Sequence, residues 1–193
     1  MMSTENTNRL LLLTAFSILI LGCQDQDGMT PLHKAIDANE DIEVIKTLVS
    51  KGANVNAKAK DGTTPLHIAT WHGQSRELVK FLVYKGADVN TQDGDDCMTP
   101  LIVALALRNV DVAKFLILEG ADVVNGKTSG GSTSLHCALG TGDIEIIKLL
   151  ISKGANVNVQ DNGGKTPLDW AKEKNEEIAE YLESEGGKSG KDL

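Results

Sequence analysis

The tripeptide Thr-Pro-Leu recurs along this chain at an almost constant interval, and this period constrains the fold more than any other feature. Four copies begin at Thr30, Thr64, Thr99 and Thr166, and the near-copy Thr133-Ser134-Leu135 fills the one gap. Successive copies are 34, 35, 34 and 33 residues apart, and all four prolines of the 193-residue chain lie in this motif. A fixed period in this range is typical of stacked repeats. The sequence therefore predicts a tandem array, and arrays of this kind usually bind partners rather than catalyse reactions.

Each repeat is expected to contain two helices, as the second repeat illustrates. Thr64 suits a helix N-cap, and Pro65 suits the first helical turn, where a missing N–H costs nothing. The first helix is predicted over about 65–72 and the second over about 76–84, with apolar residues at helical spacing. Gly86 then ends the second helix in a left-handed cap, as do its counterparts in the other repeats. These glycines are Gly52, Gly86, Gly120, Gly154 and Gly186.

The repeats share the pattern D-G-x-T-P-L-H-x-A, an apolar helix and then K-G-A-D/N-V-N. This pattern resembles ankyrin repeats and covers about residues 27–187. The resemblance implies an all-α ankyrin repeat solenoid of five helix-turn-helix units joined by β-hairpin-like loops. No unit buries its apolar face alone, so stacking supplies one continuous core. Unit three diverges most, with Ile102 where other units have His and an extra Val in its exit loop.

The resemblance and the motif positions divide the chain into consecutive segments. The last repeat is short and rich in Glu, which fits a C-terminal cap, and the residues after it are expected to form a disordered tail. The predicted boundaries are 1–22 for a signal peptide, 23–26 for a lipidated N-terminus and short linker, 27–60, 61–95, 96–129, 130–162 and 163–187 for repeats one to five, and 188–193 for the tail.

The N-terminal residues are interpreted as a targeting segment rather than as part of the array. Residues 10–21 form an apolar run of twelve residues, which is short for a membrane span of about 20 and suits a secretory signal. The run ends in Ile20-Leu21-Gly22-Cys23. This resembles the lipobox of bacterial lipoproteins, which implies cleavage after Gly22 and lipid attachment at Cys23. The alternative is an uncleaved, membrane-anchoring or merely hydrophobic N-terminus.

Composition excludes some functions. The net charge is −8 and no dense run of Lys or Arg occurs, so a nucleic-acid partner is not expected. Aromatic residues are 4 % of the chain, which predicts an aliphatic core. Cys97 and Cys137 lack a metal-binding spacing and are expected to be free, partly buried thiols; a disulfide between them is the alternative.

No motif predicts catalysis, a cofactor or a metal site. The histidines that follow the Thr-Pro-Leu motif or its variant are His33, His67 and His136. The ankyrin resemblance implies that they bridge neighbouring turns through hydrogen bonds to backbone and Thr. We therefore interpret them as structural and expect no enzyme activity.

Candidate partner-binding residues lie between the positions that recur from one repeat to the next. In ankyrin proteins, the end of the first helix faces a concave groove, which binds partners together with the hairpin tips. Trp71 and His72 occupy this place in the second repeat, and the equivalent pairs are Asp37-Ala38, Ala106-Leu107 and Gly140-Thr141. Trp71 is expected either to anchor a partner or to fill space against its neighbours. The candidate residues are Asp37, Lys58, Lys60, Asp61, Trp71, His72, Asp95, Asp96, Ala106, Leu107 and Thr141.

Together these features predict a protein-interaction scaffold at a bacterial cell envelope. It would be a monomeric array, lipid-anchored and facing the periplasm, with an unknown protein partner and with Gln24 after Cys23 favouring the outer membrane. Two alternatives remain open. One is an antitoxin-like or chaperone-like protector of an envelope enzyme. The other is a cytoplasmic or inner-membrane-anchored adaptor with an uncleaved N-terminus.

Overall fold

The computed structural model describes residues 24–72, 76–94 and 96–193, which form two compact units divided between Asp88 and Val89. The predicted signal peptide and Cys23 lie outside the described residues. Within the ranges just given, no helix combines the length and apolar character needed to cross a membrane.

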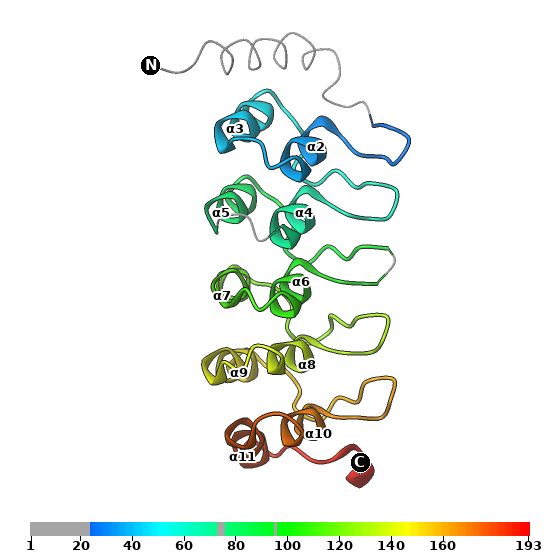
Figure 1. Ribbon diagram of the computed structural model, residues 1–193, viewed down its shortest axis with the longest axis vertical. Helices are drawn as coiled ribbons and strands as arrows, with labels where there is room; N and C mark the ends of the chain where they lie inside the picture. The colour runs from blue at the N-terminus through cyan, green and yellow to red at the C-terminus, as the bar shows by residue number, and fades with distance from the viewer. Residues whose placement is uncertain (1–23, 73–75, 95) are drawn as a thin grey trace. The chain divides into compact units, whose positions relative to one another are not determined.

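The first unit contains two helix-turn-helix repeats (Figure 1). The first repeat comprises α2 (Pro31–Asp37) and α3 (Ile42–Ser50), and the second comprises α4 (Pro65–Trp71) and α5 (Arg76–Tyr84). Helix α4 ends one residue before the predicted boundary, and α5 has the predicted bounds. In each repeat the two helices lie side by side, and the chain then extends into a hairpin-like loop on the side of the first helix (Figure 1).

The second unit repeats this arrangement three times. Its helices are α6 (Pro100–Ala106), α7 (Val110–Leu118), α8 (Ser134–Leu139), α9 (Ile144–Ser152), α10 (Pro167–Lys172), α11 (Glu176–Ser184) and the 3-10 helix η1 (Gly190–Asp192). In the described part of the chain the hairpins contain no strand, only the isolated antiparallel bridge between Lys127 and Thr133. The predicted all-α class with five repeats is confirmed.

The core of both units is aliphatic, as the low aromatic content predicts. The leucine of each Thr-Pro-Leu motif or variant is at most 2 % exposed. Phe115 is the one aromatic side chain in the buried hydrophobic set of the described residues. Since burial of each Leu contributes about 1.5–3 kcal/mol, the motif leucines are a principal reason why isolated repeats gain stability by stacking.

The predicted bridging role of the motif histidine is confirmed in detail at His33. The Thr30 backbone N–H donates to His33 Nδ1 at 3.1 Å, so Nε2 carries the proton and donates to the carbonyl of Thr63, 3.2 Å away in the next hairpin. His136 makes the same contacts to Thr133 and to the Lys165 carbonyl. Burial lowers the pKa of both imidazoles, which favours the neutral tautomer that these bonds require.

An asparagine ladder links the loops that follow the second helices. In the first unit, Asn56 Nδ2 donates to the Gly86 carbonyl at 2.7 Å, and Asn56 Oδ1 accepts from the Asp88 N–H at 2.8 Å. In the second unit, Asn90 and Asn158 make equivalent pairs of bonds. The five predicted cap glycines all have φ between 84° and 96°, and each therefore allows the sharp turn from helix to loop.

The expectation of a disordered tail at 188–193 is wrong. The Lys188 carbonyl accepts from Thr166 Oγ1 at 2.7 Å, and the Ser189 hydroxyl and Gly190 N–H donate to Asp169 at 2.7 and 2.8 Å. Burial alone raises the pKa of the Asp169 carboxyl, but these hydrogen bonds outweigh burial and hold the pKa well below its usual range. The tail thus supplies the last repeat with partners that another hairpin supplies in an interior repeat.

Candidate functional site

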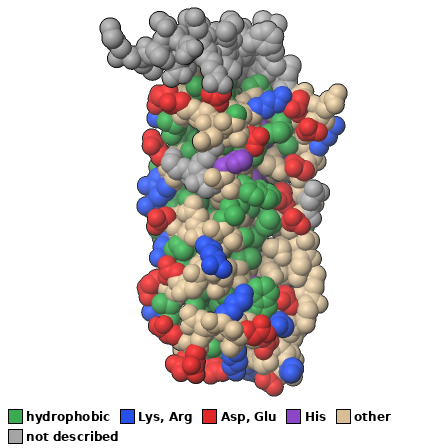
Figure 2. All heavy atoms as spheres, viewed as in Figure 1, with side chains coloured by type: hydrophobic (Ala, Val, Ile, Leu, Met, Phe, Trp, Pro, Cys, Tyr) green, Lys and Arg blue, Asp and Glu red, His purple; other side chains and the backbone are tan. Residues whose placement is uncertain are grey.

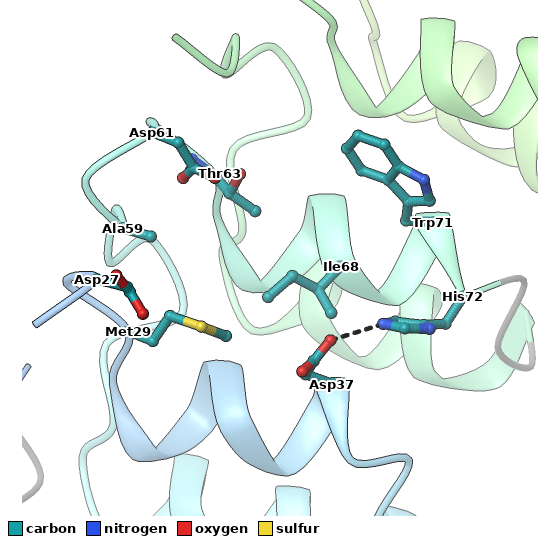
Figure 3. A pocket seen from close by; sticks show the side chains of 9 residues that line it. All are labelled: Asp27, Met29, Asp37, Ala59, Asp61, Thr63, Ile68, Trp71 and His72. Atoms are coloured by element: carbon teal, nitrogen blue, oxygen red, sulfur yellow. Dashed lines mark hydrogen bonds and ion pairs between the residues drawn. The ribbon is translucent and has the colours of Figure 1, made fainter. Parts of the chain in front are cut away.

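A pocket of about 360 Å³ lies in the first unit, between the first helices of the two repeats and their hairpins (Figure 3). One side comes from the ends of α2 and α4, and the other from the two hairpin tips. Its volume is near the lower end of the range of about 300–1,000 Å³ for ligand pockets, so it has room for one large side chain rather than for a helix.

Three carboxylates and one indole ring give the pocket its chemistry. Asp27, Asp37 and Asp61 contribute the carboxylates, and no Lys or Arg is among its lining residues within the described chain. Trp71 forms an apolar wall, and the side chains of Ile68 and Met29 lie between the helical and hairpin sides (Figure 3). The pocket therefore combines an apolar interior with negative charge at its edge.

One edge of the pocket carries a hydrogen bond between side chains of the two repeats. His72 Nε2 lies 2.8 Å from Asp37 Oδ1, and both side chains are exposed. An exposed pair of this kind contributes about 0–1 kcal/mol to stability. Its main consequence here is that Asp37 already has a partner, whereas the other two carboxylates face the pocket without an ion pair among the described residues.

The opposite edge is held by hairpin hydrogen bonds. Asp61 Oδ1 accepts from the Thr63 N–H at 2.9 Å, which fixes the turn. The Lys60 N–H donates to the Asp27 carbonyl at 2.9 Å and ties the second hairpin to the first. These contacts use backbone groups and one oxygen of Asp61, so the carboxylates are positioned by a rigid turn rather than by charge pairing.

Trp71 is 47 % exposed although it is large and apolar. As the last residue of α4 it is held at a helix end, with its ring above the pocket interior (Figure 3). The two sequence-based readings were a partner anchor and a packed space filler. About half of the residue remains open to solvent, so it is accessible to a partner.

The structure brings four of the predicted residues together at this pocket, namely Asp37, Asp61, Trp71 and His72. Two further predicted residues, Lys58 and Lys60, lie on the hairpin that carries Asp61. Both are exposed, but neither lines the pocket. The Lys58 carbonyl accepts from Gln24 Nε2 at 2.9 Å.

The other predicted residues belong to the second unit or are not described. Ala106 ends α6, and Leu107, its C-cap, is 47 % exposed. Asp96 is an exposed hairpin residue whose carbonyl accepts from the Ser129 N–H. Thr141 Oγ1 donates to the Ala138 carbonyl at 2.6 Å, so its hydroxyl stabilises the turn after α8. Asp95 lies outside the described residues.

Sequence reasoning missed the remaining lining residues, which are Asp27, Met29, Ala59, Thr63 and Ile68. A signal for three of them was present. Asp27 is the first-repeat counterpart of Asp61 in D-G-x-T, and Met29 and Thr63 occupy the variable position of that turn. Because the turn repeats in space, equivalent positions of adjacent hairpins meet at one pocket.

The described chain holds no cluster suited to a metal ion, and the pKa of its Cys137 thiol is raised. No group of three or more His, Cys, Asp or Glu side chains there is placed to hold a metal ion. Cys97 and Cys137 are free, as predicted, and half-buried. Burial raises the pKa of the Cys137 thiol to about 11, which keeps it protonated and unreactive at neutral pH. On the face in Figure 2, acidic and basic side chains are interspersed rather than gathered into a basic patch.

Comparisons with known proteins agree with this architecture. A family model described as ankyrin repeats (3 copies) matches residues 3–93 and 101–191. A second, described as ankyrin repeats (many copies), matches residues 75–117. A search of curated proteins found no match.

Proposed function

The chain belongs to the ankyrin-repeat family, and from this premise we propose that it is an interaction scaffold whose protein partner contacts the pocket at Trp71. Ankyrin repeats point to protein–protein interaction and are generally non-enzymatic. The observation that carries the proposal is a half-exposed tryptophan held at a helix end over an acidic pocket. Aromatic side chains of this kind dominate interface energies when a partner buries them.

The geometry suits a partner that binds without reshaping the array. The pocket edges are fixed by the His72–Asp37 pair and by the hairpin bonds of Asp61 and Lys60. A preformed site loses little conformational entropy on binding. The partner is therefore expected to insert one side chain beside Trp71 and to spread over the exposed hairpin tips around it.

Affinity capture from cell membranes with a tagged chain of residues 24–193 tests the scaffold role. We expect a partner that is retained by the wild-type chain and lost with Trp71→Ala. Because Trp71 is half exposed, the variant should keep its circular dichroism spectrum and its midpoint of thermal unfolding within a few degrees. The same captured proteins with a correctly folded Trp71→Ala chain would refute a role for this pocket.

The proposed location is the bacterial envelope, with the chain lipid-anchored through Cys23 and facing the periplasm. The sequence Ile20-Leu21-Gly22-Cys23 supports this proposal, and only three residues separate Cys23 from Asp27 at the pocket. Two or three acyl chains would hold the array stably at a membrane surface, where one chain is marginal. The partner would then be a membrane protein or a protein that acts close to the membrane.

Metabolic labelling with palmitate tests the anchor. We expect label in the wild-type chain, none in Cys23→Ala, and release of that variant from the membrane fraction. Cys97→Ala is the matched control and should label normally. Labelling that persists without Cys23 would exclude the lipoprotein, and an unlabelled wild-type chain would favour the uncleaved adaptor.

A further inference from the structure

The pocket beside Trp71 differs from a plain apolar anchor site because carboxylates line it. Asp27 and Asp61 line it from the hairpin side, and among described residues neither carboxylate has an ion-pair partner. Figure 3 shows both carboxylates on the hairpin side, across the pocket from Trp71. A neutral apolar side chain would fill the interior but leave these charges partly desolvated, which costs free energy.

We propose that the pocket binds an arginine side chain of the protein partner. The guanidinium would pair with Asp27 and Asp61, and its methylene stem would cross Ile68 and Met29 with Trp71 as the covering wall. This inference rests on the proposed scaffold function and names the chemistry of the partner's central contact.

Arginine matches the pocket better than lysine for two reasons. Its planar guanidinium presents five N–H donors in a fork that can reach two carboxylates at once, whereas an ammonium is a point charge. Its guanidinium is also more weakly hydrated than an ammonium and therefore loses less on entering a partly apolar pocket. The chain's net charge of −8 adds a favourable long-range field for a basic partner.

Titration of the chain with short peptides tests the inference independently of any captured partner. The probe is acetyl-Gly-Gly-Arg-Gly-Gly-amide, and the matched probe has citrulline, which keeps the shape but removes the charge. Binding is followed by the NMR signal of the Trp71 indole N–H, with Trp170 as an internal reference. Because one side chain binds weakly, we expect a dissociation constant of about 1 mM, about tenfold weaker binding of citrulline and weakening by added salt.

The decisive variant is Asp27→Asn/Asp61→Asn. Asparagine keeps the Oδ1 acceptor for the Thr63 N–H, so the turn should persist while the charge is lost. Arginine affinity should fall about tenfold, as with citrulline. Asp111→Asn/Glu119→Gln removes two exposed charges from α7 and its C-cap and should leave affinity within about twofold.

Three results would overturn the arginine assignment. These are no saturable shift of Trp71 with the arginine peptide, equal binding of citrulline, or unchanged affinity of the double Asn variant. The scaffold function is judged separately. A partner that is lost with Trp71→Ala but captured normally by the double Asn variant would leave the scaffold in place and reject arginine.

Discussion

The first and third repeats carry the same turn and helices but hold their neighbours by different means. In the first repeat, His33 donates to the Thr63 carbonyl and Asn56 bonds the Gly86 and Asp88 backbone. The third repeat has Ile102 in place of His, only 1 % exposed. Its extra Val shifts the asparagine, so Asn125 bonds Asp122 within its own repeat at 2.8 Å.

The difference shows that the repeat tolerates loss of polar ties when apolar packing replaces them. A buried His must satisfy both ring nitrogens, whereas a buried Ile needs none. The third repeat also has Cys97 at the turn position occupied by glycine in the other repeats, with φ of 55° against 77° at Gly28. The repeat is thus defined by backbone shape and burial, and several side-chain sets satisfy it.

The largest effect on stability is expected for a substitution at Gly28, in the turn of the first repeat. A Cβ at Gly28 would lie 2.8 Å from the Lys60 backbone nitrogen, and φ is positive. Gly28→Ala should lower the free energy of unfolding by about 2–3 kcal/mol, measured by urea denaturation. Gly52→Ala is the control, because its φ is also positive but nothing lies within 4 Å. Equal losses in the two variants would show that hairpin contact is not the constraint.

The asparagine of the first repeat, Asn56, should contribute more to the free energy of unfolding than Asn125 of the third repeat. Asn56→Ala removes two bonds to the next loop, and we expect a loss of about 1–2 kcal/mol. Asn125→Ala removes one side-chain bond, which is confined to a single turn, and should cost about 0.5 kcal/mol. Chemical denaturation of both variants gives the comparison. If Asn125→Ala is the more damaging, the ladder is not what ties the repeats.

Acid should weaken the His-bearing repeats specifically. Burial lowers the folded-state pKa of His33 and His136 from 6.5, so the unfolded chain binds more protons below that pH. Stability is therefore complete above pH 6.5 and falls as the pH drops below it. Unfolding free energies between pH 7.5 and 5 should show this slope. In His33→Gln/His136→Gln, where Gln can still accept from the N-cap N–H, the slope should shrink; an unchanged slope would contradict the account.

The smallest expected effect is a gain in stability from a substitution in the third repeat. Cys97→Gly removes a side chain from a left-handed conformation, and we expect stabilisation by about 0.5–1 kcal/mol, less the extra entropy of glycine in the unfolded chain. Cys137→Ala, in a helix, removes a thiol without that relief and should not stabilise. A neutral or destabilising Cys97→Gly would mean that the thiol makes compensating contacts at the turn.

The fold could be predicted from the sequence because its signals are local and repeated. Thr64, Pro65 and Gly86 act through their own turns, and five copies reinforce one another. The tail could not be predicted, because Ser189 and Gly190 are ordered by bonds to Asp169, about 20 residues away. Part of the pocket could also be predicted, because Trp71 and Asp61 stand out in the sequence by their residue type. Ile68 and Met29 become site residues only through the stacking of two repeats.

The most direct test of the central claim is the dissociation constant of the purified partner for the wild-type chain, Trp71→Ala and Leu107→Ala. Trp71, the last residue of α4, and Leu107, the C-cap of α6, have equal exposure, 47 %, but only Trp71 lines the acidic pocket. We predict at least about tenfold weaker binding for Trp71→Ala and a change within about threefold for Leu107→Ala. Wild-type affinity in Trp71→Ala would contradict the account.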